Sequence, residues 1–342
     1  MKEGKNVTKT DVLRILRENP ERHVSGEELA RLLRVSRTAV WKAVKQLERD
    51  GYSVEAASGT GYRLRAESDV LSAEGVRRLL RHREIRPLVY PSVSSTNTLL
   101  KTMAVENAPE GTAVIAAEQT GGRGRLGRSF FSPGGSGLYL SLLLRPDCAA
   151  AEATRLTACA AVAAAETAEE MSGRPAGIKW VNDVFIGGKK VCGILTEAGM
   201  DLESGRLSHV IVGIGINLRE PEGGFPEEIR SVAGAVFGNE PVPDLRNRMA
   251  AQVLDRLKDY AEDPGSDALF EAYRKRSFVP GKEILILSPG KDPIRAEAVD
   301  LNRDFSLNVR LEDGSLRTVS SGEISVRLDG RGGTEPESGT ER

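Results

Sequence analysis

The segment of this chain best suited to chemistry is a glycine-rich run with three arginines, Gly121–Arg128. It reads Gly-Gly-Arg-Gly-Arg-Leu-Gly-Arg. Glycines let the backbone approach a ligand closely and donate its amides, while guanidinium groups hold phosphate or carboxylate oxygens in a bidentate manner. The run therefore predicts a loop that wraps an anionic ligand. A flexible basic surface loop is the alternative that the run alone leaves open.

Gly122, Gly124 and Gly127 also satisfy G-x-G-x-x-G, the dinucleotide-binding fingerprint. That fingerprint requires a strand before it and a helix after it within a βαβ unit. Here the following residues, Phe130–Gly137, form a turn rich in Ser, Pro and Gly that leads into a strand. The context therefore argues against a nicotinamide or flavin site.

Several polar segments accompany this loop along the chain. In chain order they are Ser94–Asn97, Glu118–Gln119, Lys179–Asp183, Gly188–Leu195 and Gly213–Asn217. The first two close predicted strands, and the third precedes a hairpin predicted at Gly187-Gly188. These segments together with the loop predict one composite site, assembled by strands and turns.

The first 65 residues predict a winged helix-turn-helix domain. Apolar residues recur at helical spacing in three segments, and Ser25 with Glu28 forms a capping box that opens the second helix. A tight turn separates the second helix from the third. Two short β segments, Tyr52–Val54 and Tyr62–Leu64, form a hairpin. Helix, helix, tight turn, helix and hairpin is the order of a winged helix-turn-helix.

The third helix of this domain is expected to bind DNA. Residues 1–65 hold 14 Lys and Arg against 9 Asp and Glu, although the whole chain has a net charge of -1. Side chains and amides at the start of a basic, serine-capped helix can reach base edges and phosphates in a major groove. A solvated charged surface is the alternative. The expected DNA contacts are Ser36, Arg37, Thr38, Trp41, Lys42 and Lys45.

The remainder of the chain alternates strands and helices, which predicts an α+β multidomain protein with a large mixed sheet. Expected strands are Val89–Val93, Ala113–Ala117, Leu138–Leu144, Ile178–Val181, Val184–Ile186, Val191–Thr196 and Val210–Ile216. Expected helices are Ala149–Met171, Asp244–Tyr260 and Asp267–Arg276. Short strands at Ile284–Leu287, Ile294–Val299, Ser306–Leu311 and Leu316–Val319 predict a small C-terminal β-barrel. The expected domains are 1–65, 66–278 and 279–328, with a disordered tail at 329–342.

Composition argues against several classes of protein. No run of about 18 apolar residues could span a bilayer, and the first residues lack the apolar stretch of a signal peptide, so we expect a cytoplasmic protein. Cys148, Cys159 and Cys192 are an odd number without CxxC spacing, which argues against a disulfide framework and a zinc site. The three histidines lie far apart, so we expect no metal site built from His or Cys.

The chain closely resembles the biotin protein ligases in the order and the sequence of these polar segments. The resemblance includes the loop at 122–125 (GRGR) and the KW-x-ND pentapeptide at 179–183. With its N-terminal winged helix, the chain resembles the members that are biotin ligase and biotin operon repressor at once. The resemblance covers residues 1 to about 328. It implies a class II synthetase-like catalytic domain and a C-terminal SH3-like barrel, in which Ser321–Ile324 matches the closing strand. Lipoyl ligases share the catalytic fold but not this loop.

The resemblance assigns roles residue by residue. The implied biotin-binding residues are Ser95, Thr96, Asn97, Gln119, Arg123, Gly124, Arg125 and Lys190. The implied adenylate-binding residues are Gly122, Arg125, Arg128, Asn182 and Asn217. Arg123, Lys190 and Asp183 are the implied catalytic residues, since fixed cations offset the repulsion when a carboxylate attacks ATP. Asp183 could orient Lys190, orient the incoming lysine or be a structural cap, and these alternatives stay open.

The implied reaction converts biotin and ATP, with Mg²⁺, into biotinyl-5′-AMP and pyrophosphate. The biotinyl group then passes to a lysine on a biotin carboxyl carrier protein of acetyl-CoA carboxylase or a related carboxylase. Relatives dimerise when biotinyl-AMP orders the loop, so the resemblance also implies a homodimer that binds operator DNA, and no membrane partner. Two alternatives are a repressor whose catalytic domain has decayed and an enzyme of the same fold acting on lipoate or octanoate.

Three residues depart from the family pattern. Val181 stands where KWPND-type sequences have proline, and Leu126 stands where some relatives have a third basic residue. Neither change removes a polar ligand contact. Asp304 sits where a turn glycine is common, which leaves the geometry of that turn open.

Overall fold

The computed structural model describes residues 9–49, 51–57, 59–65, 69–146, 153–200, 207–288, 290–320 and 325–328. Its contacts divide the chain into two compact units, Met1–Leu79 with Asn239–Ala251, and Leu80–Gly238 with Gln252–Arg342. The expected domain limits stay predictions. The expectations for Ser321–Ile324, for the tail at 329–342 and for Cys148 fall outside the described residues.

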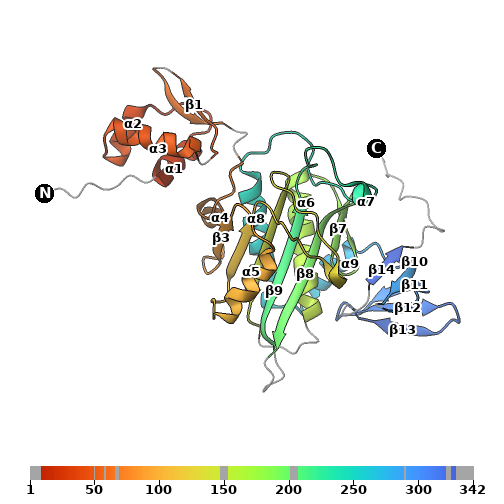
Figure 1. The fold of residues 1–342 in the computed structure, drawn as a ribbon. Coiled ribbons are helices and arrows are strands. Elements are labelled where there is room, and N and C mark those ends of the chain that lie inside the picture. Colours follow the sequence, from red (N-terminus) through yellow and green to blue (C-terminus); the bar gives the residue numbers. More distant parts are fainter. Residues whose placement is uncertain are drawn as a thin grey trace. The chain divides into compact units, whose positions relative to one another are not determined.

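The first unit contains a helix-turn-helix and a hairpin (Figure 1). Its elements are α1 (Lys9–Glu18), α2 (Gly26–Leu33), α3 (Arg37–Arg49), β1 (Val54–Ala57) and β2 (Gly61–Leu64). The amide of Glu28 donates to Ser25 Oγ at 3.0 Å, which confirms the predicted cap of α2. Gly61 is required where the hairpin meets the helices, because a Cβ there would lie 2.2 Å from the carbonyl oxygen of Val24. The three predicted helices and the hairpin are confirmed, but the first strand of the hairpin is Val54–Ala57 and not Tyr52–Val54.

Two further segments belong to this unit. They are α4 (Ala73–Leu79), which was not predicted, and the start of α8 (Leu245–Glu262), whose later residues lie in the second unit. Asp244, just before α8, accepts hydrogen bonds from Arg17 of α1 at 3.2 Å and from Arg78 of α4 at 3.1 Å. This carboxylate joins segments that are distant in the sequence.

The centre of the second unit is a seven-stranded mixed sheet in the order β3-β4-β5-β9-β8-β7-β6. Its strands are β3 (Arg86–Tyr90), β4 (Thr112–Ala116), β5 (Gly137–Leu144), β6 (Ala176–Lys179), β7 (Asp183–Ile186), β8 (Lys189–Met200) and β9 (Leu207–Asn217). Among the described strand pairs of this sheet, β3 and β4 alone are parallel. The predicted mixed sheet is confirmed, but its first strand starts at Arg86 rather than Val89. Pro87 argued against a strand at this position, but β3 lies at the edge of the sheet, where a strand can contain a proline.

Two helices cover opposite faces of this sheet: α5 (Thr96–Val105) and α6 (Ala153–Ser172). Ser141 of β5 pairs in register with Gly213 of β9, which pairs with Leu195 of β8. This row faces α5, since Ser141 bonds to the first turn of that helix. Because side chains alternate along a strand, Thr196 faces the other way, where it accepts a hydrogen bond from Thr157 of α6 at 2.7 Å. Further helical elements of this unit are η1 (Arg125–Gly127), α7 (Glu227–Arg230) and α9 (Asp267–Arg276).

The C-terminal part of the second unit is a five-stranded antiparallel sheet in the order β13-β12-β11-β10-β14. Its strands are β10 (Glu283–Leu287), β11 (Ile294–Leu301), β12 (Leu307–Leu311), β13 (Leu316–Val319) and β14 (Ser325–Leu328). The indole of Trp180 donates to the carbonyl oxygen of Phe305 at 2.8 Å, in the turn between β11 and β12. Phe305 is the left-handed residue of this turn, at φ 62°, whereas Asp304 caps it by accepting from the amide of Ser306. The position where a glycine would relieve strain is therefore Phe305 and not Asp304.

Candidate active site

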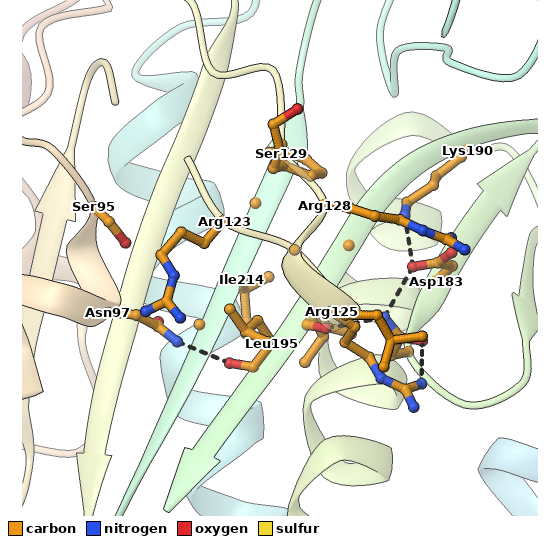
Figure 2. A pocket seen from close by; sticks show the side chains of 18 of the residues that line it. Ser95, Asn97, Arg123, Arg125, Arg128, Ser129, Asp183, Lys190, Leu195 and Ile214 are labelled. Atoms are coloured by element: carbon orange, nitrogen blue, oxygen red, sulfur yellow. Dashed lines mark hydrogen bonds and ion pairs between the residues drawn. The ribbon is translucent and has the colours of Figure 1, made fainter. Parts of the chain in front are cut away.

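Most of the predicted catalytic and ligand-binding residues line one pocket, which lies against strands β8 and β9 (Figure 2). Those that line it are Ser95, Thr96, Asn97, Gln119, Arg123, Gly124, Arg125, Arg128, Asn182, Asp183 and Lys190. Gly122 and Asn217 are not among its lining residues. The side chain of Asn217 instead donates to the carbonyl oxygen of Gly234 at 3.0 Å.

One end of the pocket is polar but neutral. Ser95 caps α5, accepting from the amide of Thr98 at 3.4 Å, so Thr96 and Asn97 lie in the first turn of the helix. The amide of Thr96 donates to Gln119 Oε1 at 2.8 Å. Gln119 Nε2 in turn donates to Ser132 Oγ at 3.0 Å, which fixes the orientation of its side chain. This end offers hydroxyl and amide groups to a ligand, as predicted.

The floor of the pocket is built from glycines on β8 and β9. A Cβ at Gly213 would lie 2.1 Å from Asn97 Oδ1, and one at Gly215 would lie 2.5 Å from the ring of Phe130. Gly193 lies on β8 directly opposite Gly215. The missing side chains make room for Asn97 against Gly213 and for the ring of Phe130 against Gly215 and Gly193.

The other end of the pocket is charged. Lys190 Nζ lies 2.7 Å from Asp183 Oδ1, which also accepts a hydrogen bond from Asn182 Nδ2 at 3.1 Å. Arg125 donates to Asn182 Oδ1 at 3.1 Å. Burial lowers the pKa of Arg125 from its usual value, while the charge of Asp183 acts against that shift. A partly buried cation beside Lys190 suits this end to anionic groups.

Backbone hydrogen bonds hold the glycine-rich loop in a closed turn. The amide of Gly124 donates to the carbonyl oxygen of Arg128 at 2.7 Å, and that of Phe130 donates to Gly122 at 2.9 Å. Leu126 occupies the left-handed region at φ 56°. Arg123 reaches across to Glu197 of β8 at 3.2 Å (Figure 2 shows the loop side chains). The loop is thereby tied to the sheet at the neutral end of the pocket.

Sequence reasoning missed several residues of this site. Ser132 orients Gln119, Glu197 pairs with Arg123, and Ser141 lies under α5. Ser141 had a usable signal, because it interrupts a nearly continuous apolar run at 138–144 and is fully buried. Glu197 had none, since a glutamate near the end of a strand is ordinary.

The predicted DNA contacts lie along α3 in the first unit. Ser36 caps this helix, accepting from the amide of Ala39 at 3.2 Å. Arg37, Thr38 and Lys42 are exposed, and Trp41 leaves 51% of its surface exposed, which is unusual for tryptophan without a partner. Lys45 is partly covered and pairs with Glu48 at 2.7 Å.

No described helix is both long and apolar enough to cross a bilayer. Within the same residues, no three His, Cys, Asp or Glu side chains gather as metal ligands.

Comparison with known proteins matches both parts of the chain. Residues 89–217 match the biotin/lipoate A/B protein ligase family, and residues 8–63 match a helix-turn-helix domain. The bifunctional ligase/repressor BirA of Bacillus subtilis is 40% identical over 231 residues, covering 67% of this chain and 70% of that protein. BirA of Escherichia coli is 30% identical over 321 residues, covering 90% of this chain and 94% of that protein.

A similar solved structure is the biotin protein ligase from Aquifex aeolicus in complex with biotin and ATP. It has a TM-score of 0.58 and 30% sequence identity, and the match covers 71% of this chain and 99% of that one.

Proposed function

The chain belongs to the biotin/lipoate A/B protein ligase family, and from this premise we propose how it acts as a biotin ligase and biotin-responsive repressor. Its pocket joins biotin and ATP to give biotinyl-5′-AMP and pyrophosphate. The biotinyl group then passes to a lysine of a biotin carboxyl carrier protein, that of acetyl-CoA carboxylase or a related carboxylase. The helix-turn-helix unit binds operator DNA of biotin genes.

One observation carries the ligase proposal: a single pocket has a neutral polar end at Thr96 and Gln119 and a charged end at Lys190 and Asp183. Biotin has the same division, with a polar urea at one end, apolar rings, and a carboxylate at the other. The ring of Phe130, which lies over Gly215, offers apolar surface for the sulfur-containing ring and the side chain of biotin. Polarity therefore favours biotin with its carboxylate toward Lys190.

In the first step a biotin carboxylate oxygen attacks the α-phosphorus of ATP. A new P–O bond forms, and the bond to pyrophosphate breaks. Both reactants are anions, so Lys190 and Arg125 lower the barrier by offsetting their repulsion. Arg123 contributes to the same effect once it leaves its ion pair with Glu197. Asp183 already holds Lys190 at 2.7 Å, which favours a positioning role for this carboxylate.

In the second step the neutral ε-amine of the carrier lysine attacks the acyl carbon. The bond to AMP breaks, AMP leaves with the electron pair, and the amine loses its proton. Holding both reactants in one pocket supplies much of the rate without a covalent enzyme intermediate.

The nucleotide lies toward Asn182 and Arg128 in this scheme. Gly122 and Asn217 act through the backbone they shape: a Cβ at Gly122 would lie 2.3 Å from the carbonyl oxygen of Phe130, and Asn217 holds Gly234. Mg²⁺ would accompany ATP, and Asp183, a carboxylate that lines the pocket, could help to hold it. That arrangement suits Mg²⁺, which commonly uses one or two carboxylates plus substrate phosphates.

We also infer the finer fold classes. The mixed sheet is that of a class II synthetase-like domain, and the five-stranded C-terminal sheet is an SH3-like barrel. The antiparallel order β13-β12-β11-β10-β14 and the bulge in β11 support the second inference, since bulges bend strands toward closure.

The repressor arm couples ligand to DNA. Biotinyl-AMP orders the Gly121–Arg128 loop and promotes a homodimer, which binds the operator through Arg37, Thr38 and Lys42, with Ser36, Trp41 and Lys45 beside them. Ordering a glycine-rich loop costs conformational entropy that ligand contacts must offset, so the order of this loop depends on the bound ligand and the loop acts as the sensor. In a gel-shift assay with the promoter DNA of the biotin genes from the same organism, binding should require both biotin and ATP. Equal binding without them would contradict the coupling.

The ligase proposal is tested by incubating the protein with Mg-ATP and either biotin or lipoate. Mass spectrometry should detect biotinyl-AMP and no lipoyl-AMP. Biotin transfer to a purified carrier domain, read with labelled streptavidin, tests the second step. If the folded protein forms no biotinyl-AMP, the assignment as a biotin ligase is wrong.

A further inference from the structure

The two residues that precede Asn182 are each held by an aromatic residue distant in the sequence. The indole of Trp180 donates to the carbonyl oxygen of Phe305 at 2.8 Å. The hydroxyl of Tyr273, on α9, donates to the carbonyl oxygen of Val181 at 3.3 Å. These two hydrogen bonds fix the chain just before it reaches the charged end of the pocket.

Phe305 and Tyr273 form one buried aromatic pair. Their rings meet edge to face, with 5.2 Å between the centroids, and both side chains are fully buried. Burial raises the pKa of Tyr273 above its usual value, and the charge of Asp183 adds to the shift. The hydroxyl of Tyr273 therefore keeps its proton and serves as a donor to Val181.

The backbone of Phe305 is strained. Its φ of 62° lies in the left-handed region, which is unusual for a bulky side chain. Such a conformation costs free energy and persists only where the surrounding contacts hold it. Here it directs the carbonyl oxygen toward Trp180, while the ring packs against Tyr273. The strain is thus kept at the point where this turn supports the pocket segment.

Asn182 carries this support to the charged groups. Its Nδ2 donates to the carbonyl oxygen of Ile194 at 3.0 Å and to Asp183 Oδ1 at 3.1 Å. Its Oδ1 accepts from Arg125 at 3.1 Å, and its carbonyl oxygen accepts from the amide of Ile194 at 2.9 Å. A shift of the chain before Asn182 would therefore disturb Arg125 and Asp183 together.

We propose that Tyr273 and Phe305 are positioning residues for the adenylation step. They hold the backbone that presents Asn182 and Asp183 to the nucleotide. The inference rests on the proposed function, which places the nucleotide at this end of the pocket. Neither aromatic residue is among those that line the pocket, so both act through the segment that they support. Small displacements of positioning groups slow a reaction strongly even when they arise away from the reacting atoms.

Tyr273→Phe tests the proposal because it keeps the ring and removes only the hydroxyl. The buried carbonyl of Val181 then loses this donor, and its segment shifts to recover a partner. In single turnovers with varied ATP, kcat/KM for ATP should fall about tenfold, equivalent to about 1.4 kcal/mol. The Kd of biotin, measured by calorimetry, should stay within about twofold of wild type, because the neutral end of the pocket does not use this support.

Tyr260→Phe is the matched control. It removes the hydroxyl that donates to Glu166 at 3.1 Å, and Tyr260 is not among the residues that line the pocket. Its kcat/KM for ATP should equal that of wild type. Circular dichroism melts report whether each variant folds. Phe305→Leu, which removes the ring that packs on Tyr273, should act like Tyr273→Phe and provides a second measure if that variant does not fold.

A double variant separates positioning from a general loss of stability. If Tyr273 acts through Asn182, Tyr273→Phe should change kcat/KM little in a protein that already carries Asn182→Ala. Additive losses, an unchanged kcat/KM for ATP in Tyr273→Phe, or an equal loss of biotin affinity would overturn the inference. If the wild-type protein forms no biotinyl-AMP, the proposed function fails instead.

Discussion

Replacing Lys190 with alanine should slow formation of biotinyl-AMP about 100-fold. The lysine Nζ lies 2.7 Å from Asp183 Oδ1 at the charged end of the pocket. Removing it leaves a carboxylate without its cation where two more anions must meet. Loss of one preorganised donor to a developing charge costs about 100- to 1,000-fold in rate, or about 2.7–4 kcal/mol. Because the Lys190 side chain is 31% exposed, solvent screening places the expected loss at the lower limit.

The assay is a single turnover with excess protein, saturating biotin and ATP labelled in its α-phosphate. It isolates the chemical step from release of product. Lys189→Ala is the matched control, because Lys189 precedes Lys190 on β8 but donates to the carbonyl oxygens of Ser231 and Arg230 instead of lining the pocket. Adenylation by Lys189→Ala should match wild type.

Two results would refute this reasoning. One is an unchanged single-turnover rate in Lys190→Ala, and the other is an equal loss in Lys189→Ala. The role of Asp183 is read from the double variant with Asp183→Asn. If Asp183 acts by positioning Lys190, the two effects should be far from additive. Additive losses would favour a direct role for Asp183 with the nucleotide or the incoming amine.

Three further predictions concern other parts of the chain. Gly213→Ala should abolish biotin binding detectable by calorimetry, because the new Cβ would lie 2.1 Å from Asn97 Oδ1 at the neutral end of the pocket. Gly238→Ala is the control and should bind biotin normally, because the space around its Cβ is open. Lys42→Ala should weaken operator binding and lower the slope of log K against log[salt] by about 1 if this exposed lysine contacts a phosphate, and an unchanged slope would count against that contact. His82 has a raised pKa: burial opposes the shift, but hydrogen bonds with carboxylates, including Asp259 at 2.7 Å, outweigh it. The stabilisation of the fold by protonated His82 is thus complete below about pH 6.5 and is lost as the pH rises through the pKa of the folded state. His82→Gln should therefore lower the Tm at pH 6 and change it little at pH 9.

The features that sequence predicted correctly are set by local interactions. Ser25 and Glu28 are three residues apart, so a capping box is legible from the sequence and is present at 3.0 Å. Gly187 and Gly188 form the hairpin turn between β7 and β8 with φ of 57° and 73°. Such backbone angles favour glycine, and two adjacent glycines between apolar strands therefore predict this turn. The seven residues of α4 were too few to produce a clear helical period, and this helix was missed.

The charged end of the pocket was predictable for a related reason. Asn182 and Asp183 are neighbours, and a two-residue turn brings Lys190 back beside them on the next strand. A hairpin recognised from its glycines thus already places the ammonium near the carboxylate. The two-residue turn at Gly187-Gly188 is sufficient to predict this proximity, and no contact between distant parts of the sequence is needed.

The neutral end depends on strand register, which the sequence does not specify residue by residue. Asn97 meets Ser141 across 44 positions and Glu197 across 100, and both contacts exist only because Ser141, Gly213 and Leu195 align across three strands. A one-residue slip of either strand pair would turn this row to the α6 face and replace Gly213 with a larger neighbour. The contacts of Asn97 at the neutral end of the pocket would then be lost, whereas the loop would keep its three arginines. The two ends of the pocket therefore have different origins in this chain: the charged end depends on local motifs, and the neutral end depends on the pairing of β5, β9 and β8.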